Sequence, residues 1–380
     1  MIPFNKPSIT KLENKYIKQA IESGKLCGDG SFTKKVKEIF KEKFNIDNFL
    51  LTTSCSSALD MSAILLDLKP GDEVILPSYT FVSTANAVIL RGATPVFCDV
   101  EPSTMNIDAN LIEKLVTPKT KAIYVVHYAG VVCEMDKIMA IAKKHNLYVV
   151  EDAAQAVGSY YKGKVAGTIG DMGCYSFHET KNYSMGEGGA LIINNKKFLE
   201  RAEIIREKGT NRSQFLRGQV DKYTWQDAGS SFLPSDVLAA MLFGQMQRFD
   251  EIMNKRLTAW NTYKAGLKDL EEKGFIELQQ GQTKNSTHNA HMFYILTKDI
   301  EERDRLIKFL KTNGVASAFH YVPLHSSPFA KKILKKIPNL PITNEYSARL
   351  LRLPMYADLT KKDLNKVITL MHEFYGVKNA

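Results

Sequence analysis

The sequence lacks a pattern of paired cysteines. Its five cysteines, an odd number, are Cys27, Cys55, Cys98, Cys133 and Cys174, and they show no paired spacing. This pattern argues against a disulfide framework and against a zinc site. We therefore expect a reducing, cytoplasmic environment and no bound metal.

Long apolar runs are also missing. No stretch reaches the length of a membrane span, and Met1–Pro7 lacks the basic region followed by an apolar region that marks a signal peptide. We therefore expect neither a membrane partner nor a leader segment. The sequence has no internal repeat and no low-complexity linker either.

Basic residues are numerous but are not gathered in one stripe. Lys and Arg number 51 against 41 Asp and Glu, which gives a net charge of +10. Because this excess is spread along the chain, it indicates a solvated surface, and nucleic acid is not an expected partner. A modest attraction for small anionic substrates is compatible with it.

What the sequence does contain is an alternation of short apolar runs and helix-like segments. The runs that predict strands are Phe49–Thr52, Glu73–Leu76, Thr94–Cys98, Ala122–His127, Leu147–Glu151, Gly173–Phe177 and Ala190–Ile193. Amphipathic stretches such as Ser57–Leu68 and Met135–His145 separate most of them. The alternation predicts an α/β fold with a mostly parallel central sheet covered by helices on both faces.

A chain of 380 residues favours two domains over one. A long helical stretch, from Ser235 to about Leu270, ends the alternation. After it, Ala290–Leu296, Glu301–Asn313 and Ala316–His320 indicate a smaller α+β unit, whose last helix spans Thr360–Tyr375. We predict a large α/β domain over residues 1–250, with an N-terminal helical segment, and a small C-terminal α+β domain over residues 251–380.

The stretch Gly170–Ala190 carries the most informative pattern. Two strand-like runs flank a polar loop that contains Lys181, and three glycines (Gly186, Gly188 and Gly189) follow this lysine. A lysine recessed in such a loop is suited to forming a Schiff base, because partial burial lowers its pKa and supplies the neutral amine.

An acidic pair follows another predicted strand. In Glu151–Gln155, the carboxylate of Asp152 would be costly to bury without a cation or hydrogen-bond donors. One interpretation is that it pairs with a protonated heterocyclic nitrogen. The alternative, which the motif alone leaves equally open, is that it caps the following turn.

Two further segments lie between a predicted strand and a helix. The hydroxyls of Thr52–Leu59 at a helix start suit an anion such as phosphate, although ordinary capping gives the same pattern. Phe81 or Tyr79, in Pro77–Thr84, could stack on a flat ring, although aromatic residues near strand ends commonly belong to the core.

An anion cradle, an aromatic face, a carboxylate and a recessed lysine are together what pyridoxal 5′-phosphate (PLP) requires. Because ligands in open α/β sheets bind at the carboxyl ends of the strands, these segments are expected to meet there. The sequence therefore predicts a PLP site.

The chain resembles the DegT/DnrJ/EryC1/StrS family of sugar aminotransferases along nearly its whole length. The combination of Glu-Asp-Ala-Ala-Gln, Ser-Phe-x-x-x-Lys and Gly-Glu-Gly-Gly is highly specific for that family. The matching stretches are Ile2–Phe4, Gly24–Gly30, Pro70–Ile75, Pro77–Thr84, His127–Gly130, Glu151–Gln155, Ser176–Gly189 and His320–His325. The resemblance implies the fold type I architecture of PLP-dependent transferases.

The resemblance also implies roles for individual residues. Lys181 would hold the cofactor covalently and move the proton, and Asp152 would pair with the ring nitrogen. The remaining cofactor contacts would come from Gln155, Phe81, Ser176, Ser56, Ser57 and Ser231, the last replacing a family asparagine that reaches the partner chain's phosphate. The substrate contacts would come from His178, Tyr183 and His320, with His325 in the same family motif.

Family members are homodimers with composite active sites, which implies a homodimer here, with a dimer of dimers left open. Several stretches resemble in particular the members that transfer the amino group of L-glutamate to C4 of dTDP-4-keto-6-deoxyglucose. The alternatives are another nucleotide-linked ketosugar, either a 3-keto sugar or one linked to GDP or UDP, and a non-catalytic PLP-binding regulator. Intact Lys181, Asp152 and Gln155 argue against the regulator.

Overall fold

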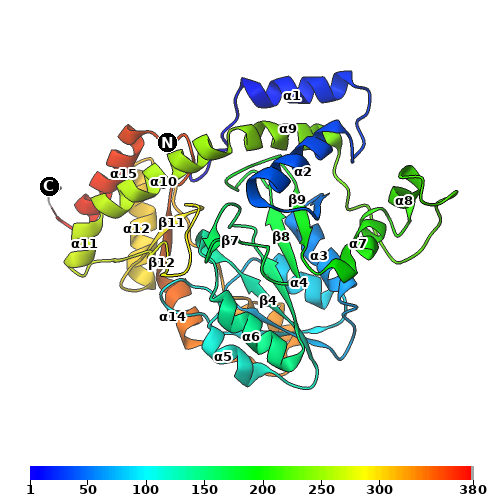
Figure 1. The fold of residues 1–380 in the computed structure, drawn as a ribbon. Helices are drawn as coiled ribbons and strands as arrows, with labels where there is room; N and C mark the ends of the chain where they lie inside the picture. The colour runs from blue at the N-terminus through cyan, green and yellow to red at the C-terminus, as the bar shows by residue number, and fades with distance from the viewer. Residues whose placement is uncertain (378–380) are drawn as a thin grey trace.

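The computed structural model describes residues 1–377, and a seven-stranded sheet forms its centre (Figure 1). The strand order is β1-β9-β8-β5-β4-β2-β3. The strands are β1 (Phe49–Thr52), β2 (Glu73–Pro77), β3 (Thr94–Cys98), β4 (Thr120–Val126), β5 (Tyr148–Asp152), β8 (Met172–Ser176) and β9 (Gly189–Ile193). Strand β9 is antiparallel to β8 and β1, whereas the other paired strands are parallel. The predicted mostly parallel sheet is confirmed.

Both faces of this sheet are buried, because consecutive side chains of each strand alternate between two hydrophobic clusters. Phe49 and Leu51 of β1 belong to one cluster, and Leu50 belongs to the other. The first cluster is covered by α2 (Ser31–Phe44), α5 (Ala109–Leu115), α6 (Met135–His145) and α9 (Asp236–Gln247). The second is covered by α3 (Cys55–Leu65), α4 (Val82–Ile89) and α7 (Leu199–Arg206).

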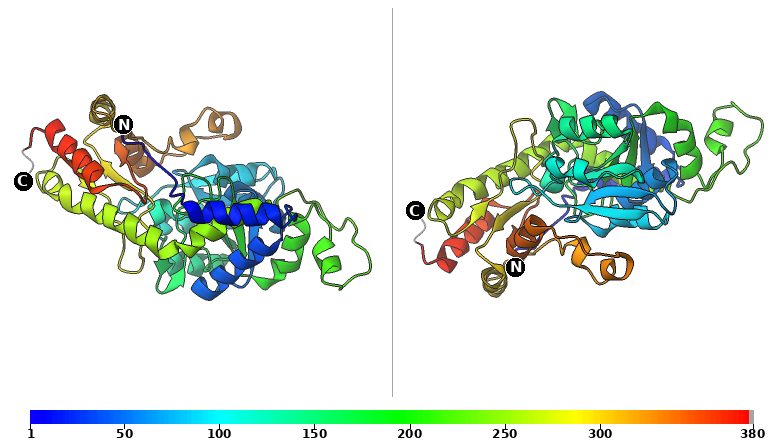
Figure 2. Two further views of the ribbon diagram at one scale, coloured as in Figure 1. Left: turned by 90° about the horizontal axis from the view of Figure 1, so that it is seen from above. Right: turned by 90° about the horizontal axis from the view of Figure 1, so that it is seen from below.

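The N-terminal helix α1 (Lys11–Glu22) lies along α9 on the outside of this layer (Figures 1 and 2). Its capping box, in which Thr10 and Glu13 exchange side-chain and backbone hydrogen bonds, defines where it begins. The buried carboxylate of Glu13 also binds Arg248 and Gln245. Arg248 marks a break in the predicted long helical stretch, which forms α9, α10 (Phe249–Gly266) and α11 (Lys268–Glu272) in succession.

The C-terminal part has a core of its own around a three-stranded antiparallel sheet. Its strands are β10 (Glu277–Leu278), β11 (Phe293–Leu296) and β12 (Leu350–Leu353), and its main helices are α10, α12 (Ile300–Thr312), α14 (Pro341–Arg349) and α15 (Lys361–Phe374). Ile2 joins this core by pairing with Val315. The division into residues 1–250 and 251–380 is the boundary that we propose.

One segment that indicated this smaller unit does not join its sheet. Ala316–His320 is not a strand, because only Ala318 pairs with a neighbour, through an isolated bridge to Arg352. The third strand is instead β12. Smaller elements are the hairpin β6 (Tyr160–Tyr161) and β7 (Lys164–Val165) and the helices α8 (Arg212–Leu216) and α13 (Ala330–Ile333). Among residues 1–377, no helix has both the length and the apolar character that crossing a bilayer requires.

Candidate active site

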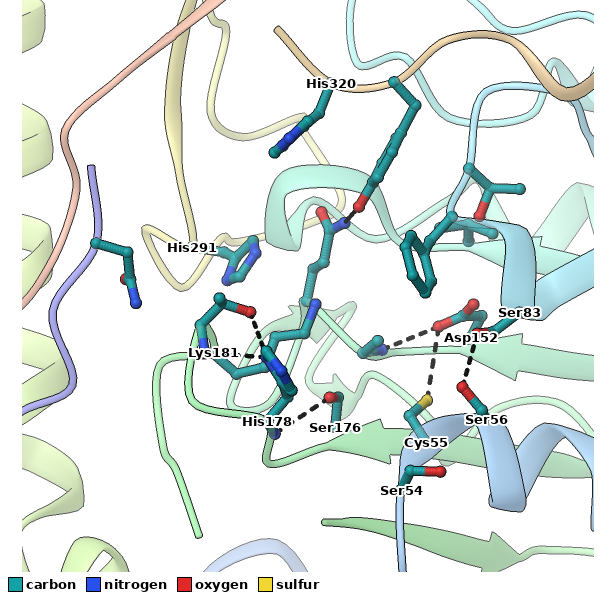
Figure 3. A pocket seen from close by; sticks show the side chains of 18 of the residues that line it. Ser54, Cys55, Ser56, Ser83, Asp152, Ser176, His178, Lys181, His291 and His320 are labelled. Carbon is teal, nitrogen blue, oxygen red and sulfur yellow. Dashed lines mark hydrogen bonds between the residues drawn. The ribbon is translucent and has the colours of Figure 1, made fainter. Parts of the chain in front are cut away.

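A cavity of about 530 Å³ opens at the carboxyl ends of the parallel strands, where the sequence predicts the cofactor site (Figure 3). The loops after β1, β2, β5 and β8 line one side of it, and segments of the C-terminal part line the other. Among the lining residues are Ser54, Cys55, Ser56, Phe81, Ser83, Asp152, Gln155, Ser176, His178, Lys181, His291, His320, Tyr321 and Arg352. The structure thus brings most of the predicted site residues together.

Lys181 lies on the loop between β8 and β9. This loop folds back on itself, because Phe177 N donates to Gly188 O at 2.8 Å and Glu179 N donates to Gly186 O at 2.8 Å. Gly186 has a φ of +81°, a left-handed conformation that favours glycine. Among residues 1–377, the Lys181 amine has no hydrogen-bond or ion-pair partner within range. Burial lowers its pKa against the opposing charges of Cys55 and Asp152, and so favours the neutral, nucleophilic amine.

Asp152, the last residue of β5, is buried and has no paired cation in the described chain. Its Oδ2 accepts from Thr84 Oγ1 at 2.7 Å, and its Oδ1 accepts from Ala154 N at 3.2 Å. Burial raises the pKa of this carboxyl in spite of both donors. The turn-capping interpretation is therefore correct for one oxygen, yet the carboxylate as a whole still lacks a cation.

The neighbouring Glu151 points to the opposite face of the sheet, as successive strand residues do. Its carboxylate accepts from the amides of Gly167, Ile169 and Gly170 at 2.6 to 2.8 Å. It also lies 2.8 Å from His127 Nε2. Because His127 Nδ1 accepts from Cys133 N, the proton of a neutral His127 lies on Nε2 and is donated to Glu151. Glu151 therefore organises the loop before β8 and does not face the cavity.

The start of α3 forms the hydroxyl-rich end of the cavity. Ser54 is the N-cap residue, and its Oγ accepts from Ser57 N at 3.0 Å. Ser57 does not line the cavity, because its hydroxyl bonds Thr53 and Ser54. Ser56 does line it, and its Oγ lies 2.6 Å from Ser83 Oγ. With the positive end of the α3 dipole, these hydroxyls suit an anion.

Phe81 supplies an open aromatic face at the wall of the cavity. It occupies the N-cap position of α4, and 56% of its surface is exposed. Tyr79, the other aromatic candidate, is buried and donates its hydroxyl hydrogen bond to the His320 carbonyl. Of the two residues, Phe81 is therefore the one that could stack on a ligand.

Gln155 is held by two contacts that orient its amide. Its Oε1 accepts from Ala129 N at 2.7 Å, and its Nε2 donates to Tyr321 Oη at 3.1 Å. The phenol of Tyr321 therefore belongs to the wall of the cavity, and the sequence analysis did not single it out.

The histidines of the cavity differ in their surroundings. His178 lies near the mouth, where its Nδ1 bonds Thr180 Oγ1 and its Nε2 is 3.5 Å from Glu187. His320 accepts from Arg352, and burial together with that charge lowers its pKa to about 4. His291, which the sequence analysis missed, is buried and bonds Asn182, and burial lowers its pKa well below the ordinary range.

The structure does not bring Tyr183 to the cavity, which corrects the expected substrate contact. Tyr183 is buried, its ring stacks on Phe249 with centroids 4.5 Å apart, and its hydroxyl donates to the Phe249 carbonyl. His325 is also buried and bonds Ser78. Ser231 is exposed and does not line the cavity of its own chain. Its predicted contact belongs to a second chain and stays a prediction.

These groups fit PLP. A phosphate would meet the hydroxyls at the start of α3, and a protonated ring nitrogen would supply the cation that Asp152 lacks. An aldehyde would meet the unpartnered amine of Lys181, and a planar ring would meet the exposed face of Phe81.

Comparison with known proteins gives matches along nearly the whole chain. The sequence pattern of the DegT/DnrJ/EryC1/StrS aminotransferase family matches residues 7–372. The chain is 29% identical to the GDP-perosamine synthase of Escherichia coli O157:H7, over 99% of each chain. It is 31% identical to the spore coat polysaccharide biosynthesis protein SpsC of Bacillus subtilis, over 100% of this chain and 98% of the other. The solved structure of an aminotransferase from Psychrobacter cryohalolentis superposes with a TM-score of 0.92 at 28% identity, covering 98% of this chain and 99% of the other.

Proposed function

The chain belongs to the DegT/DnrJ/EryC1/StrS family and is a PLP-dependent sugar aminotransferase, and from this premise we propose its substrates. The proposed reaction moves the amino group of L-glutamate to C4 of dTDP-4-keto-6-deoxyglucose. The products are dTDP-4-amino-4,6-dideoxygalactose and 2-oxoglutarate.

The choice of this sugar is supported by local resemblance to dTDP-4-amino-4,6-dideoxygalactose transaminase. The resembling stretches are Ser23–Asp29, Cys133–Asp136, Ser176–Tyr183 and Glu203–Trp225. A GDP-linked 4-keto sugar is the second candidate, because the Escherichia coli relative is a GDP-perosamine synthase.

The observation that supports the reaction type is that one cavity contains two groups without an ion-pair partner. These groups are the Lys181 amine and the Asp152 carboxylate. When bound, PLP supplies an electron-accepting ring that stabilises the negative charge left on carbon as a proton leaves. Asp152 keeps the ring nitrogen protonated, and its contacts with Thr84 and Ala154 hold the carboxylate in place.

Lys181 acts as the base and then as the acid. Its lowered pKa lets the free amine accept the proton from the α-carbon of glutamate, and the resulting ammonium later returns a proton to C4 of the sugar. The face of C4 that receives this proton decides whether the new amine is axial or equatorial.

Four residues position the cofactor in this proposal. Ser56 and Ser176 bind the phosphate, and Phe81 stacks on the ring. Gln155 reaches the phenolic oxygen of the ring, with its amide oriented by Ala129 and Tyr321. We further propose a homodimer in which Ser231 of one chain completes the phosphate site of the other.

The proposal is tested by supplying purified enzyme with PLP, L-glutamate and either the dTDP-linked or a GDP-linked 4-keto-6-deoxy sugar. We expect 2-oxoglutarate and an amino sugar from the dTDP substrate, with an axial 4-amine in the NMR coupling pattern. Turnover of the GDP sugar alone would refute the proposed substrate and leave the reaction type standing. An equatorial amine would refute the proposed product.

A further inference from the structure

Arg352 is a cation at the cavity wall without a counter-charge. It lies on β12 and lines the cavity. Within residues 1–377, no carboxylate lies within ion-pairing distance of its guanidinium. Nη1 donates to His320 Nδ1 at 2.6 Å, and the guanidinium carbon lies 4.8 Å from the centroid of the Phe4 ring. Arg352 is therefore held by neutral groups.

Part of the hydrogen-bonding capacity of this guanidinium is unused. Its buried Nε has no acceptor, and Nη2 has none among the described residues. These two nitrogens share the edge that a carboxylate binds with both of its oxygens. Arg352 therefore lines a cavity, has no carboxylate partner and has unused N–H donors. These are the properties of a residue that binds an anionic ligand.

The electrostatic surroundings of Arg352 also favour an anion. Burial, reinforced by the charge of Arg352, lowers the pKa values of His291 and His320, so both rings are neutral at pH 7. The same charge lowers the pKa of Lys181 in addition to burial. Two acidic residues line the cavity: Asp152, which is bound to Thr84 and Ala154, and Glu187, which lies 3.5 Å from His178. Neither carboxylate pairs with Arg352, so within residues 1–377 the positive charge of its guanidinium is not compensated.

The side of the cavity that carries Arg352 is separate from the hydroxyl-rich end. In Figure 3, Ser54, Ser56 and Ser83 gather beside Asp152 at the right, whereas His291 and His320, the histidine bonded to Arg352, lie to the left and above. An anion bound at Arg352 is therefore a different group from an anion bound at the start of α3.

We propose that Arg352 binds the α-carboxylate of the amino donor, an inference that depends on the proposed transfer from glutamate. In glutamate, the α-carboxylate is attached to the same carbon as the reacting amine, and that amine must displace Lys181. Arg352 and Lys181 line the same cavity, so the carboxylate of a donor whose amine reaches Lys181 can be bound by Arg352. A bidentate contact there fixes the rotation of the α-carbon and directs its proton toward Lys181.

The test compares three donors that differ in one charge, L-glutamate, its α-amide L-isoglutamine and its γ-amide L-glutamine. The donor half-reaction of the PLP-loaded enzyme is followed in single turnovers by cofactor absorbance, for the wild type, Arg352→Gln and Arg352→Lys. For the wild type, we expect the α-amide to react about 10- to 100-fold less efficiently than glutamate. For Arg352→Gln, we expect glutamate to lose a similar factor and the difference between the two donors to disappear.

A binding measurement separates recognition from chemistry. α-Methyl-L-glutamate has no α-proton to lose, so calorimetry reports its binding, including any displacement of Lys181, without amino transfer. We expect Arg352→Gln to weaken this binding at least 10-fold and Arg352→Lys, which keeps the charge without the planar fork, to weaken it less. Arg349→Gln is the matched control, because Arg349 lies immediately before β12 and pairs with Glu277 and Glu345, outside the cavity lining. It should leave donor selectivity unchanged.

Several results would overturn the inference. One such result is a preference for glutamate over its α-amide that is equal in the wild type and in Arg352→Gln. Another is that Arg352→Gln loses the preference for glutamate over glutamine, which would place the γ-carboxylate at Arg352. A change confined to the sugar half-reaction would assign Arg352 to the nucleotide sugar. A wild type that does not react with glutamate at all would instead refute the proposed donor, and the two failures are thereby distinguished.

Discussion

Replacing Asp152 by Asn should stabilise the protein without PLP while removing most of its activity. The carboxylate is 5% exposed, and burial raises its pKa. A carboxyl group whose pKa is raised by folding contributes its stability below the unfolded pKa, and that stability is lost as pH rises through the folded pKa. Above the folded pKa, the ionised Asp152 is therefore a net cost to the cofactor-free protein.

The size of the gain follows from what asparagine keeps and loses. It keeps the shape and one acceptor, and it removes the buried charge. The second acceptor becomes a donor, which Thr84 tolerates because its hydroxyl also lies 2.9 Å from Thr80 Oγ1 and either oxygen can donate. We expect a net gain of about 1 kcal/mol, since an unmade hydrogen bond offsets part of the removed charge cost. For a chain of this length, this corresponds to a rise in Tm of about 2 °C.

The assay combines thermal unfolding of the PLP-free protein with steady-state turnover of the PLP-loaded enzyme. Turnover should fall by about 100-fold or more, because a neutral amide no longer holds the proton on the ring nitrogen. The predicted stability difference should shrink as pH falls, because Asp152 itself becomes neutral. A loss of Tm in the PLP-free variant, or turnover close to that of the wild type, would refute the reasoning.

Three further substitutions test other parts of the site. Lys181→Ala should abolish turnover and the absorbance of lysine-bound PLP. The control Lys164→Ala, on the exposed hairpin, should change neither. Residual activity of Lys181→Ala would refute the central role of Lys181. Glu151→Gln should lower the free energy of unfolding by about 3 kcal/mol, measured by urea denaturation, because three backbone amides and the buried His127 donate to its carboxylate. A loss under 1 kcal/mol would contradict this. Tyr183→Ala should cost about 3 kcal/mol by cavity formation, with KM values for both substrates unchanged in the folded fraction; a selective rise of one KM would restore Tyr183 as a substrate contact.

The central sheet could be predicted because its signal is local. Each strand is buried on both faces, so it appears in the sequence as a continuous apolar run, and the seven predicted runs form the seven strands to within two residues. Strand β12 was missed because Leu350–Leu353 carries Arg352 and follows a helix without a turn signal. The break at Arg248 carries no clear local signal, because two of the partners of Arg248, Ser8 and Glu13, are far away in the sequence.

The candidate site divides in the same way. Lys181, Asp152, Ser56 and Phe81 lie at a strand end, in a loop after a strand or at a helix start, so their neighbours in sequence indicate where they lie. His291, Tyr321 and Arg352 reach the cavity from the C-terminal part, and the sequence near them gives no periodic signal of that position. Tyr183 was expected at the cavity because it is close to Lys181 in the sequence, yet it lies in the core. Two residues after Lys181, the backbone has already turned so that the Tyr183 side chain is buried.

Substitutions at Glu151 and Asp152, the two adjacent carboxylates of β5, have different consequences. Damage at Glu151 acts on the folded population, so lower temperature or a stabilising change elsewhere can rescue it. Damage at Asp152 acts on a protein that is folded and abundant, and no gain in stability restores it. In a library of random variants selected for activity, tolerance at position 151 should therefore increase with the stability of the parent, whereas tolerance at position 152 should not.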